Sequence, residues 1–236
     1  MLARADLRIA VVIPAYQAAG TVAAVVAGAR VGRPGAPVYL VDDGSTDGTG
    51  DVGRGRGATV LRHATNRGKG AALATGIAAA LAADADVIVT LDADGQHPPA
   101  EIPRLLAPIA DGRADLVLGA RARTGSMPVS RRFTNWLSAR LATRLAGQGV
   151  SDAQTGFRAF TRGVAQRVRP VEERYAYETA FLLGALHSGS RVTCVAIPTI
   201  YGGAESHFRP WADTWSVARV FARYARRILI GAAGAA

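Results

Sequence analysis

The stretch Asp86–Gln96, DVIVTLDADGQ, joins an apolar run to a pair of carboxylates. Its valines and isoleucine favour a buried strand, and Asp92 and Asp94 follow where that strand should end. Two acids so close together repel each other unless a positive group lies between them. Carboxylate oxygens are the ligands that Mg²⁺ and Mn²⁺ prefer, and these ions often share them with substrate phosphates. The stretch therefore predicts a divalent-cation site at a strand tip, with Gln96 as a further oxygen ligand.

A bare Asp-x-Asp is more often a solvated turn, so the surrounding sequence has to decide. Apolar strand-like runs alternate with helix-like runs along most of the chain, which predicts an α/β fold with a mainly parallel sheet covered on both faces. The expected strands lie within residues 8–16, 37–49, 58–63, 85–95, 114–123 and 191–201, and the expected helices within 20–30, 68–83, 98–111, up to about 145, 175–189 and 210–230.

Three of the predicted strands end in polar or acidic clusters, at residues 16–17, 42–43 and 92–94. In parallel sheets, ligands bind outside the carboxyl ends of the strands. We therefore expect one site at one edge of the sheet.

The loops that follow these strands have compositions suited to a nucleotide. In VDDGSTDGT (41–49), Asp42 or Asp43 can accept a hydrogen bond from a base or a ribose hydroxyl, although Ser45, Thr46 and Asp47 are also good helix N-caps. In NRGKGAAL (66–73), glycines and cations stand at a predicted helix start, an arrangement that suits phosphate.

The overall charge points to an anionic partner. The 236 residues include 28 Lys and Arg against 18 Asp and Glu, a formal net charge of +10. A hydrophobic content of 49% excludes a disordered chain, and neither a secretory signal nor an 18-residue apolar span is recognisable. Nucleic-acid binding is disfavoured because aromatic residues are only 6% of the chain and the acidic strand ends repel phosphates.

Together these segments resemble the family 2 glycosyltransferases of the GT-A fold. The resemblance rests on VVIPAYQ (11–17), VDDGSTDGT, NRGKGAAL and LDADGQ (91–96), in that order. Within that family the chain is most similar to the polyprenyl-phosphate (dolichol-phosphate) sugar synthases, through LVLGARAR (116–123), RRFTNWLSARL (131–141) and DAQTGFRAF (152–160). The resemblance implies one GT-A domain over residues 1–210, in which 1–120 bind the nucleotide sugar and 121–210 the acceptor.

The resemblance also implies a set of site residues. Those expected to bind the nucleotide sugar are Pro14, Ala15, Tyr16, Asp42, Asp43, Lys69, Gly70, Asp92, Ala93 and Asp94. Those expected to organise the metal, Mg²⁺ or Mn²⁺, are Asp92, Asp94 and Gln96. Those expected to meet the acceptor phosphate are Arg121, Arg131, Arg132, Ser206, His207 and Arg209. Asp94, Arg121 and Arg131 are the expected catalytic residues.

The implied activity is an inverting, metal-dependent transfer of a hexose, mannose from GDP-mannose, to polyprenyl phosphate. The basic segment 211–236 is expected to form an amphipathic helix, which either lies on an anionic bilayer or packs on the core with a solvated basic face. The expected location is the cytoplasm, peripherally at the inner face of the cell membrane. A soluble acceptor is the alternative; if it offers a neutral hydroxyl, a base is needed, and Asp94, His97 and Asp152 are the candidates.

Overall fold

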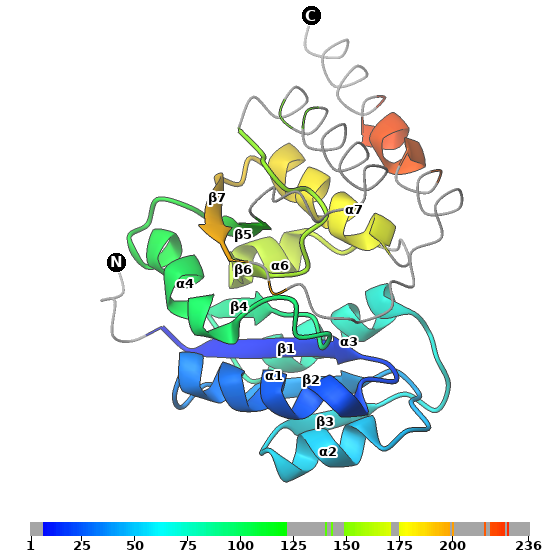
Figure 1. Ribbon diagram of the computed structural model, residues 1–236. Coiled ribbons are helices and arrows are strands. Elements are labelled where there is room, and N and C mark those ends of the chain that lie inside the picture. Colours follow the sequence, from blue (N-terminus) through cyan, green and yellow to red (C-terminus); the bar gives the residue numbers. More distant parts are fainter. Residues whose placement is uncertain are drawn as a thin grey trace, which may run out of the picture.

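The computed structural model describes residues 7–121, 140, 143, 149–170, 175–198, 200, 215, 218–224 and 226, without the side chains of residues 121 and 175. Within these ranges one sheet has the strand order β3-β2-β1-β4-β6-β5-β7 (Figure 1). The strands are β1 (Ile9–Ala15), β2 (Val38–Asp42), β3 (Thr59–Arg62), β4 (Val87–Thr90), β5 (Leu116–Arg121), β6 (Arg158–Thr161) and β7 (Val192–Ile197). The helices are α1 (Ala19–Gly32), α2 (Thr49–Gly55), α3 (Lys69–Ala82), α4 (Ile102–Ala110), α6 (Arg162–Arg167) and α7 (Tyr175–His187), with a 3₁₀ turn η1 (Pro99–Glu101).

The sheet is mainly parallel, as predicted, with one reversed strand in its middle. The pairs β1–β2, β1–β4, β2–β3 and β5–β7 are parallel, whereas β6 runs antiparallel to both of its neighbours, β4 and β5. Because β6 opposes both, β4 and β5 point the same way and end at the same edge. The start of β6 reaches that edge too, which brings the loop before β6 to the tips of β4 and β5.

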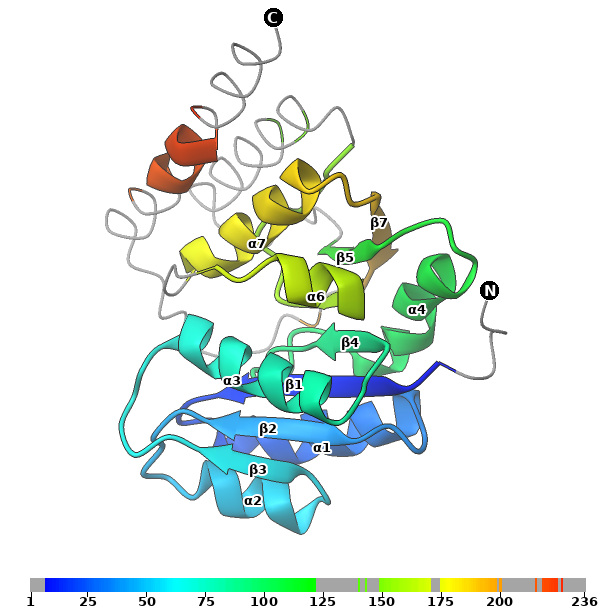
Figure 2. The same cartoon turned by 180° about the vertical axis from the view of Figure 1, so that it is seen from behind.

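Helices cover both faces of the sheet, so its central strands are apolar on both sides. Val11 and Ile13 of β1 join a buried cluster that includes residues of α1 and α4, and Ala10 and Val12 join a second cluster with α3, α6 and α7. Figure 2 shows α3, α6 and α7 together on the side opposite α1. The alternation of β1 between two cores explains why its sequence is apolar almost without interruption.

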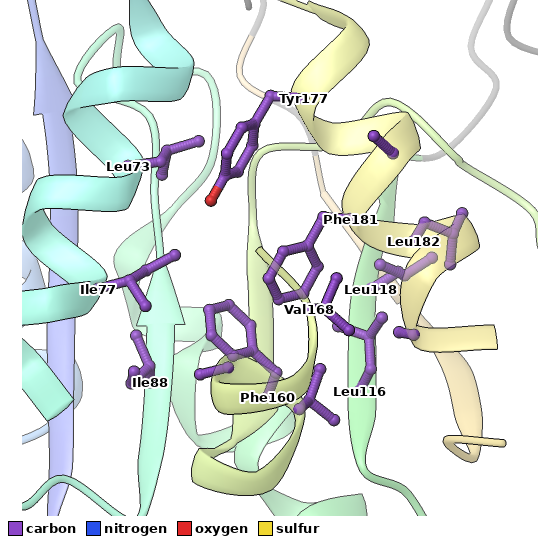
Figure 3. Packing of buried hydrophobic residues seen from close by; sticks show 14 of the residues in the cluster. Leu73, Ile77, Ile88, Leu116, Leu118, Phe160, Val168, Tyr177, Phe181 and Leu182 are labelled. Carbon is purple, nitrogen blue, oxygen red and sulfur yellow. The ribbon is translucent and has the colours of Figure 1, made fainter. Parts of the chain in front are cut away.

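Aromatic packing fixes α7 over β6. The ring centroids of Phe160 and Phe181 are 4.8 Å apart, and those of Tyr177 and Phe181 are 6.3 Å apart. Figure 3 shows these rings between α3, which contributes Leu73 and Ile77, and α7. The first turns of α3 and α7 are thereby held near each other at the edge where the parallel strands end.

The predicted helices 20–30, 68–83, 98–111 and 175–189 correspond to α1, α3, α4 and α7, whereas α2, α6 and β6 were not predicted. Residues 218–224 of the predicted terminal helix are helical, with Val220 and Phe221 buried in the cluster that includes α7. Arg219 and Arg223 of this segment are exposed. This short segment therefore packs on the core, and the rest of 211–236 lies largely outside the described residues. Within the described ranges, no helix has the length and apolar character needed to cross a bilayer.

Candidate active site

The carboxyl ends of the neighbouring strands β1, β2 and β4 meet at one edge, as the sequence predicted. Ala15 of β1 is in register with Asp42 of β2, and the amide of Leu91 donates to the carbonyl of Val12 across the β4–β1 pair. Tyr16, at the tip of β1, is 46% exposed, whereas Pro14 and Ala15 before it are buried. An exposed aromatic ring at a strand tip is a suitable surface for stacking a nucleobase.

Side chains of the loop after β2 hold the loop after β1 in place. Gln17 has a left-handed φ of 50°, an uncommon conformation for a residue with a side chain. Its amide donates to Oγ of Ser45, and its Oε1 accepts from the amide of Thr46. Asp47 accepts from the amides of Ala19 and Thr49, at the starts of α1 and α2. Asp47 therefore binds the first amide of two helices, although the N-cap positions of α1 and α2 are Ala18 and Gly48 and not the predicted Ser45, Thr46 or Asp47.

Asp42 is almost completely buried at the tip of β2, with 1% of its surface exposed. Its Oδ1 accepts from the amide of Ser45 at 2.9 Å, and its Oδ2 lies 3.6 Å from Nε of Arg62. That Oδ2 has no hydrogen-bond partner among the described residues. This oxygen is itself buried, so a base or ribose hydroxyl can reach it only if a neighbouring group moves aside.

Asp43 anchors the segment that leads into α3. Its carboxylate accepts from the amides of Arg67 and Gly68 at 2.9 and 2.8 Å, and lies 2.6 Å from Nδ1 of His63. His63 in turn contacts Oγ1 of Thr75 at 3.0 Å. The carboxylate of Asp43 is thus engaged by its own chain, whereas Oδ2 of Asp42 has no hydrogen-bond partner among the described residues.

The turn that carries Asp92 and Asp94 is ordered by backbone contacts. Oδ1 of Asp94 accepts from the amide of Gln96 at 2.9 Å, and Gly95 between them has a φ of 73°, which glycine adopts at low cost. Thr21 of α1 donates to the carbonyl of Ala93 at 2.6 Å. The turn is therefore fixed to α1, which the loops after β1 and β2 position in turn.

Asp92 shares an ammonium with a second acid that the sequence analysis did not single out. Nζ of Lys69, the first residue of α3, lies 2.8 Å from Oδ1 of Asp92 and 2.6 Å from Oε1 of Glu178. Burial disfavours the charged ammonium, but the charges of Asp92 and then Glu178 outweigh burial and raise the pKa of Lys69 above its ordinary value. Lys69 therefore stays charged and offsets part of the negative charge at the site.

Arg158 is a second buried cation at the site and was also missed. Its guanidinium donates to the carbonyls of Thr155, Glu178 and Ala153 at 2.7, 2.7 and 3.0 Å. Burial lowers its pKa, against the opposing effect of the surrounding carboxylates, of which Glu178 is the largest. Arg158 thereby joins the loop before β6 to the first turn of α7.

The residues at the β4 tip suit a hard divalent cation. Asp92 and Asp94 are partly exposed and supply carboxylate oxygens from one turn, the donor chemistry that Mg²⁺ and Mn²⁺ prefer. Within the described ranges, no group of three or more His, Cys, Asp or Glu residues gathers around a common point. An ion held here would therefore complete its coordination with water and ligand phosphates, as Mg²⁺ usually does.

Several predicted site residues lie outside the part of the chain that the structure describes. The backbone of Arg121 ends β5, in register with Ile197 of β7 and at the same edge as the tip of β4. The side chain of Arg121 is not described, nor are the residues Arg131, Arg132, Ser206, His207 and Arg209.

Two of the candidate bases are buried. His97 is 3% exposed, with its ring centroid 5.7 Å from that of Phe157, and Asp152 is 2% exposed. Of the three candidates, Asp94 is the one with partial exposure at the strand edge.

Residues 10–169 of the chain match the model of glycosyl transferase family 2. The chain belongs to this family. The undecaprenyl-phosphate mannosyltransferase of Micrococcus luteus is 30% identical over 203 residues, which cover 81% of this chain and 83% of that protein. The dolichyl-phosphate hexose transferase of Haloferax volcanii is 35% identical over 209 residues, covering 86% of this chain and 88% of that protein.

Solved structures share the GT-A fold predicted from the sequence. The glucosyl-3-phosphoglycerate synthase of Mycobacterium tuberculosis, in complex with Mn²⁺, UDP and phosphoglyceric acid, superposes with a TM-score of 0.77. The two chains are 21% identical, and the superposition covers 94% of this chain and 79% of the synthase chain.

The sequence of this glycosyltransferase contains a signal for Arg158 and Glu178, which the sequence analysis missed. Glu178 is the only charged residue in the apolar run YAYETAFLLGAL (175–186), and Arg158 stands in the apolar stretch GFRAF (156–160). A charged residue buried in an apolar element needs a partner. The sequence does not say which partner, because Lys69, Arg158 and Glu178 come from three distant segments.

Proposed function

We propose that this glycosyltransferase moves a hexose from a nucleotide sugar to the phosphate of a polyprenyl phosphate, with inversion at the anomeric carbon and with Mg²⁺ or Mn²⁺. We expect GDP-mannose to be the donor and mannose to be the transferred sugar. The reaction would take place at a membrane surface, where the lipid acceptor resides. The observation that carries the proposal is the pair Asp92 and Asp94, on an ordered turn beside the loops of β1 and β2.

The names of the relatives support the proposed lipid-phosphate acceptor more strongly than they support mannose as the transferred sugar. They include transferases named for undecaprenyl phosphate, dolichyl phosphate, polyprenol and dodecaprenyl phosphate. The sugars in the same names differ: mannose, N-acetylglucosamine, galacturonate and 4-deoxy-4-formamido-L-arabinose. A lipid phosphate is therefore the part of the reaction that these relatives have in common.

A phosphate acceptor also fits the buried positions of His97 and Asp152. A phosphate monoester has a second pKa of about 6, so its attacking oxygen is already anionic at neutral pH and needs no general base. The enzyme has instead to bring two anions together, the acceptor phosphate and the donor diphosphate. Correct positioning and nearby positive charge overcome the repulsion between these anions. We expect Arg121, Arg131 and Arg132 to supply this charge to the acceptor phosphate.

On the donor side, Asp92 and Asp94 would hold the divalent ion, which when bound supplies positive charge to the departing diphosphate. We expect the exposed ring of Tyr16 and the carboxylate of Asp42, at the tips of β1 and β2, to bind the nucleoside. Asp43 would shape the segment at the start of α3, and Lys69 would neutralise part of the charge on Asp92.

The experiment is a transfer assay with radiolabelled GDP-mannose, UDP-glucose and UDP-N-acetylglucosamine, each with undecaprenyl phosphate in detergent. We expect label from one donor to enter the organic phase with Mn²⁺ or Mg²⁺ and to stay in the aqueous phase with EDTA. D92N and D94N should each lower the rate at least about 100-fold, a loss typical of removing transition-state charge stabilisation. D51N, at an exposed acid on α2, is the matched control and should leave the rate unchanged.

Parallel reactions with 3-phosphoglycerate in place of the lipid decide between acceptor classes. Label found only in a water-soluble product would contradict the proposed acceptor and favour the soluble alternative. Label in the organic phase that is insensitive to EDTA and to both substitutions would contradict the proposed role of Asp92 and Asp94.

A further inference from the structure

The backbone of Gly156 lies directly against the carboxylate of Asp92. A Cβ atom placed on Gly156 would be 2.4 Å from Oδ1, 2.4 Å from Oδ2 and 2.6 Å from Cγ of Asp92, and these are its three nearest neighbours. Ordinary contacts of a Cβ atom begin at about 3.4 Å. The missing side chain at position 156 is therefore space that the Asp92 carboxylate occupies.

Backbone conformation does not require glycine at this position. The φ of Gly156 is not among the positive values found at other glycines of the chain, such as Gly95. An alanine at 156 is therefore compatible with the local backbone, and the contact with Asp92 is what it would disturb.

The Gly156 backbone is held in place from both sides, so it cannot easily retreat from a new methyl group. Oγ1 of Thr90, two residues before Asp92, donates to the Gly156 carbonyl at 2.8 Å. On the other side, Arg158 donates to the carbonyl of Thr155, the residue before Gly156. A Cβ atom at 156 would thus push the Asp92 carboxylate aside by about 1 Å, since side-chain ends move more easily than a pinned backbone.

The carboxylate of Asp92 is also held electrostatically. Nζ of Lys69 lies 2.8 Å from Oδ1 of Asp92 and is itself held by Glu178 at 2.6 Å. The Asp92 carboxylate therefore contacts both the bare backbone of Gly156 and a fixed ammonium.

We propose that Gly156 is a positioning residue for metal binding: its missing side chain sets the direction in which Asp92 presents its oxygens to the divalent cation. This inference rests on the metal dependence in the proposed function. Mg²⁺ requires near-ideal geometry at 2.0–2.1 Å, so a displacement of about 1 Å takes a ligand out of its coordination sphere.

The test is the affinity of the full chain for Mn²⁺, measured by the EPR signal of the free ion, with saturating GDP and separately with saturating UDP. We expect G156A to weaken Mn²⁺ binding at least tenfold while its melting temperature stays within a few degrees of wild type. Affinity for the same nucleotide in EDTA should change less than twofold, because Asp92 is proposed to act through the metal, whereas Tyr16 and Asp42 are the proposed nucleoside contacts. A crystal structure of G156A should show the Asp92 carboxylate displaced by about 1 Å away from residue 156.

G149A is the matched control. A Cβ atom on Gly149 has no neighbour within 4 Å, so this variant should bind Mn²⁺ within twofold of wild type. A second variant, T90V, keeps the shape of a buried side chain but removes the hydrogen bond to Gly156, and should weaken Mn²⁺ binding two- to fivefold. If G156A does not fold, T90V decides the question.

The outcomes separate this inference from the function on which it rests. A wild-type chain that binds no Mn²⁺ with either nucleotide would overturn the proposed metal dependence, and the positioning role with it. A wild-type chain that binds Mn²⁺, together with a folded G156A or a T90V that binds it equally well, would overturn the positioning role alone.

Discussion

Replacing Arg158 by methionine should destabilise the protein strongly, although Arg158 is not among the predicted site residues. Methionine fills a similar length but donates no hydrogen bond, so the buried carbonyls of Ala153, Thr155 and Glu178 would lose the donors that lie at 2.7–3.0 Å. Hydrogen bonds to charged groups contribute about 1.5–3 kcal/mol each. The carboxylate of Glu178 would also lose a nearby buried cation.

These losses are partly offset, because methionine does not have to be desolvated as a guanidinium does. Breaking one side of a buried charge arrangement typically costs about 3–5 kcal/mol, and we expect R158M to lose about 4 kcal/mol of the free energy of unfolding. For a chain of this size, 1 kcal/mol corresponds to about 2–4 °C, so the melting temperature should fall by about 8–16 °C.

The assay is reversible urea unfolding followed by circular dichroism, with calorimetry for the melting temperature. R113M is the control, because Arg113 is an exposed arginine paired with Asp111, and its loss should change stability by less than about 0.5 kcal/mol. A loss below about 1 kcal/mol for R158M, or equal losses for the two variants, would refute the view that Arg158 holds the loop before β6 to α7.

Two further predictions concern the scaffold. G76A should lower the free energy of unfolding by about 1–3 kcal/mol in urea titrations, since its Cβ atom would lie 2.3 Å from Cγ1 of Val12 where α3 packs on β1; an unchanged stability would mean that α3 can move away from the sheet. The hydrogen bond from Arg191 lowers the pKa of Asp115, so the stability that this pair contributes is complete above the ordinary pKa of about 3.9 and is lost as the pH falls through the lower folded-state value. D115N should therefore show a shallower fall of melting temperature with pH below about 4 than wild type, and parallel acid limbs for the two proteins would contradict this assignment.

The strand-end motifs were predictable because they follow from local sequence and one general property of parallel sheets. The apolar runs specified β1, β2 and β4, and parallel strands must end at a common edge. The register of Ala15 with Asp42 confirmed that the two loops adjoin. The different tasks of Asp42 and Asp43 were not predictable, because adjacent residues of one strand end point to opposite sides and meet different neighbours.

The sequence by itself determined the α/β class, the family and the acids at the tip of β4, since periodicity and motifs are properties of contiguous residues. Only the tertiary structure decided what surrounds those acids. The reversed strand β6 brings Gly156 to Asp92, and the packing of α7 brings Glu178 to Lys69, across more than 60 residues of chain in each case. Contacts of this kind depend on how the sheet and its helices pack together, which no local pattern specifies, and they set the direction and the charge of the carboxylate on which the proposed chemistry depends.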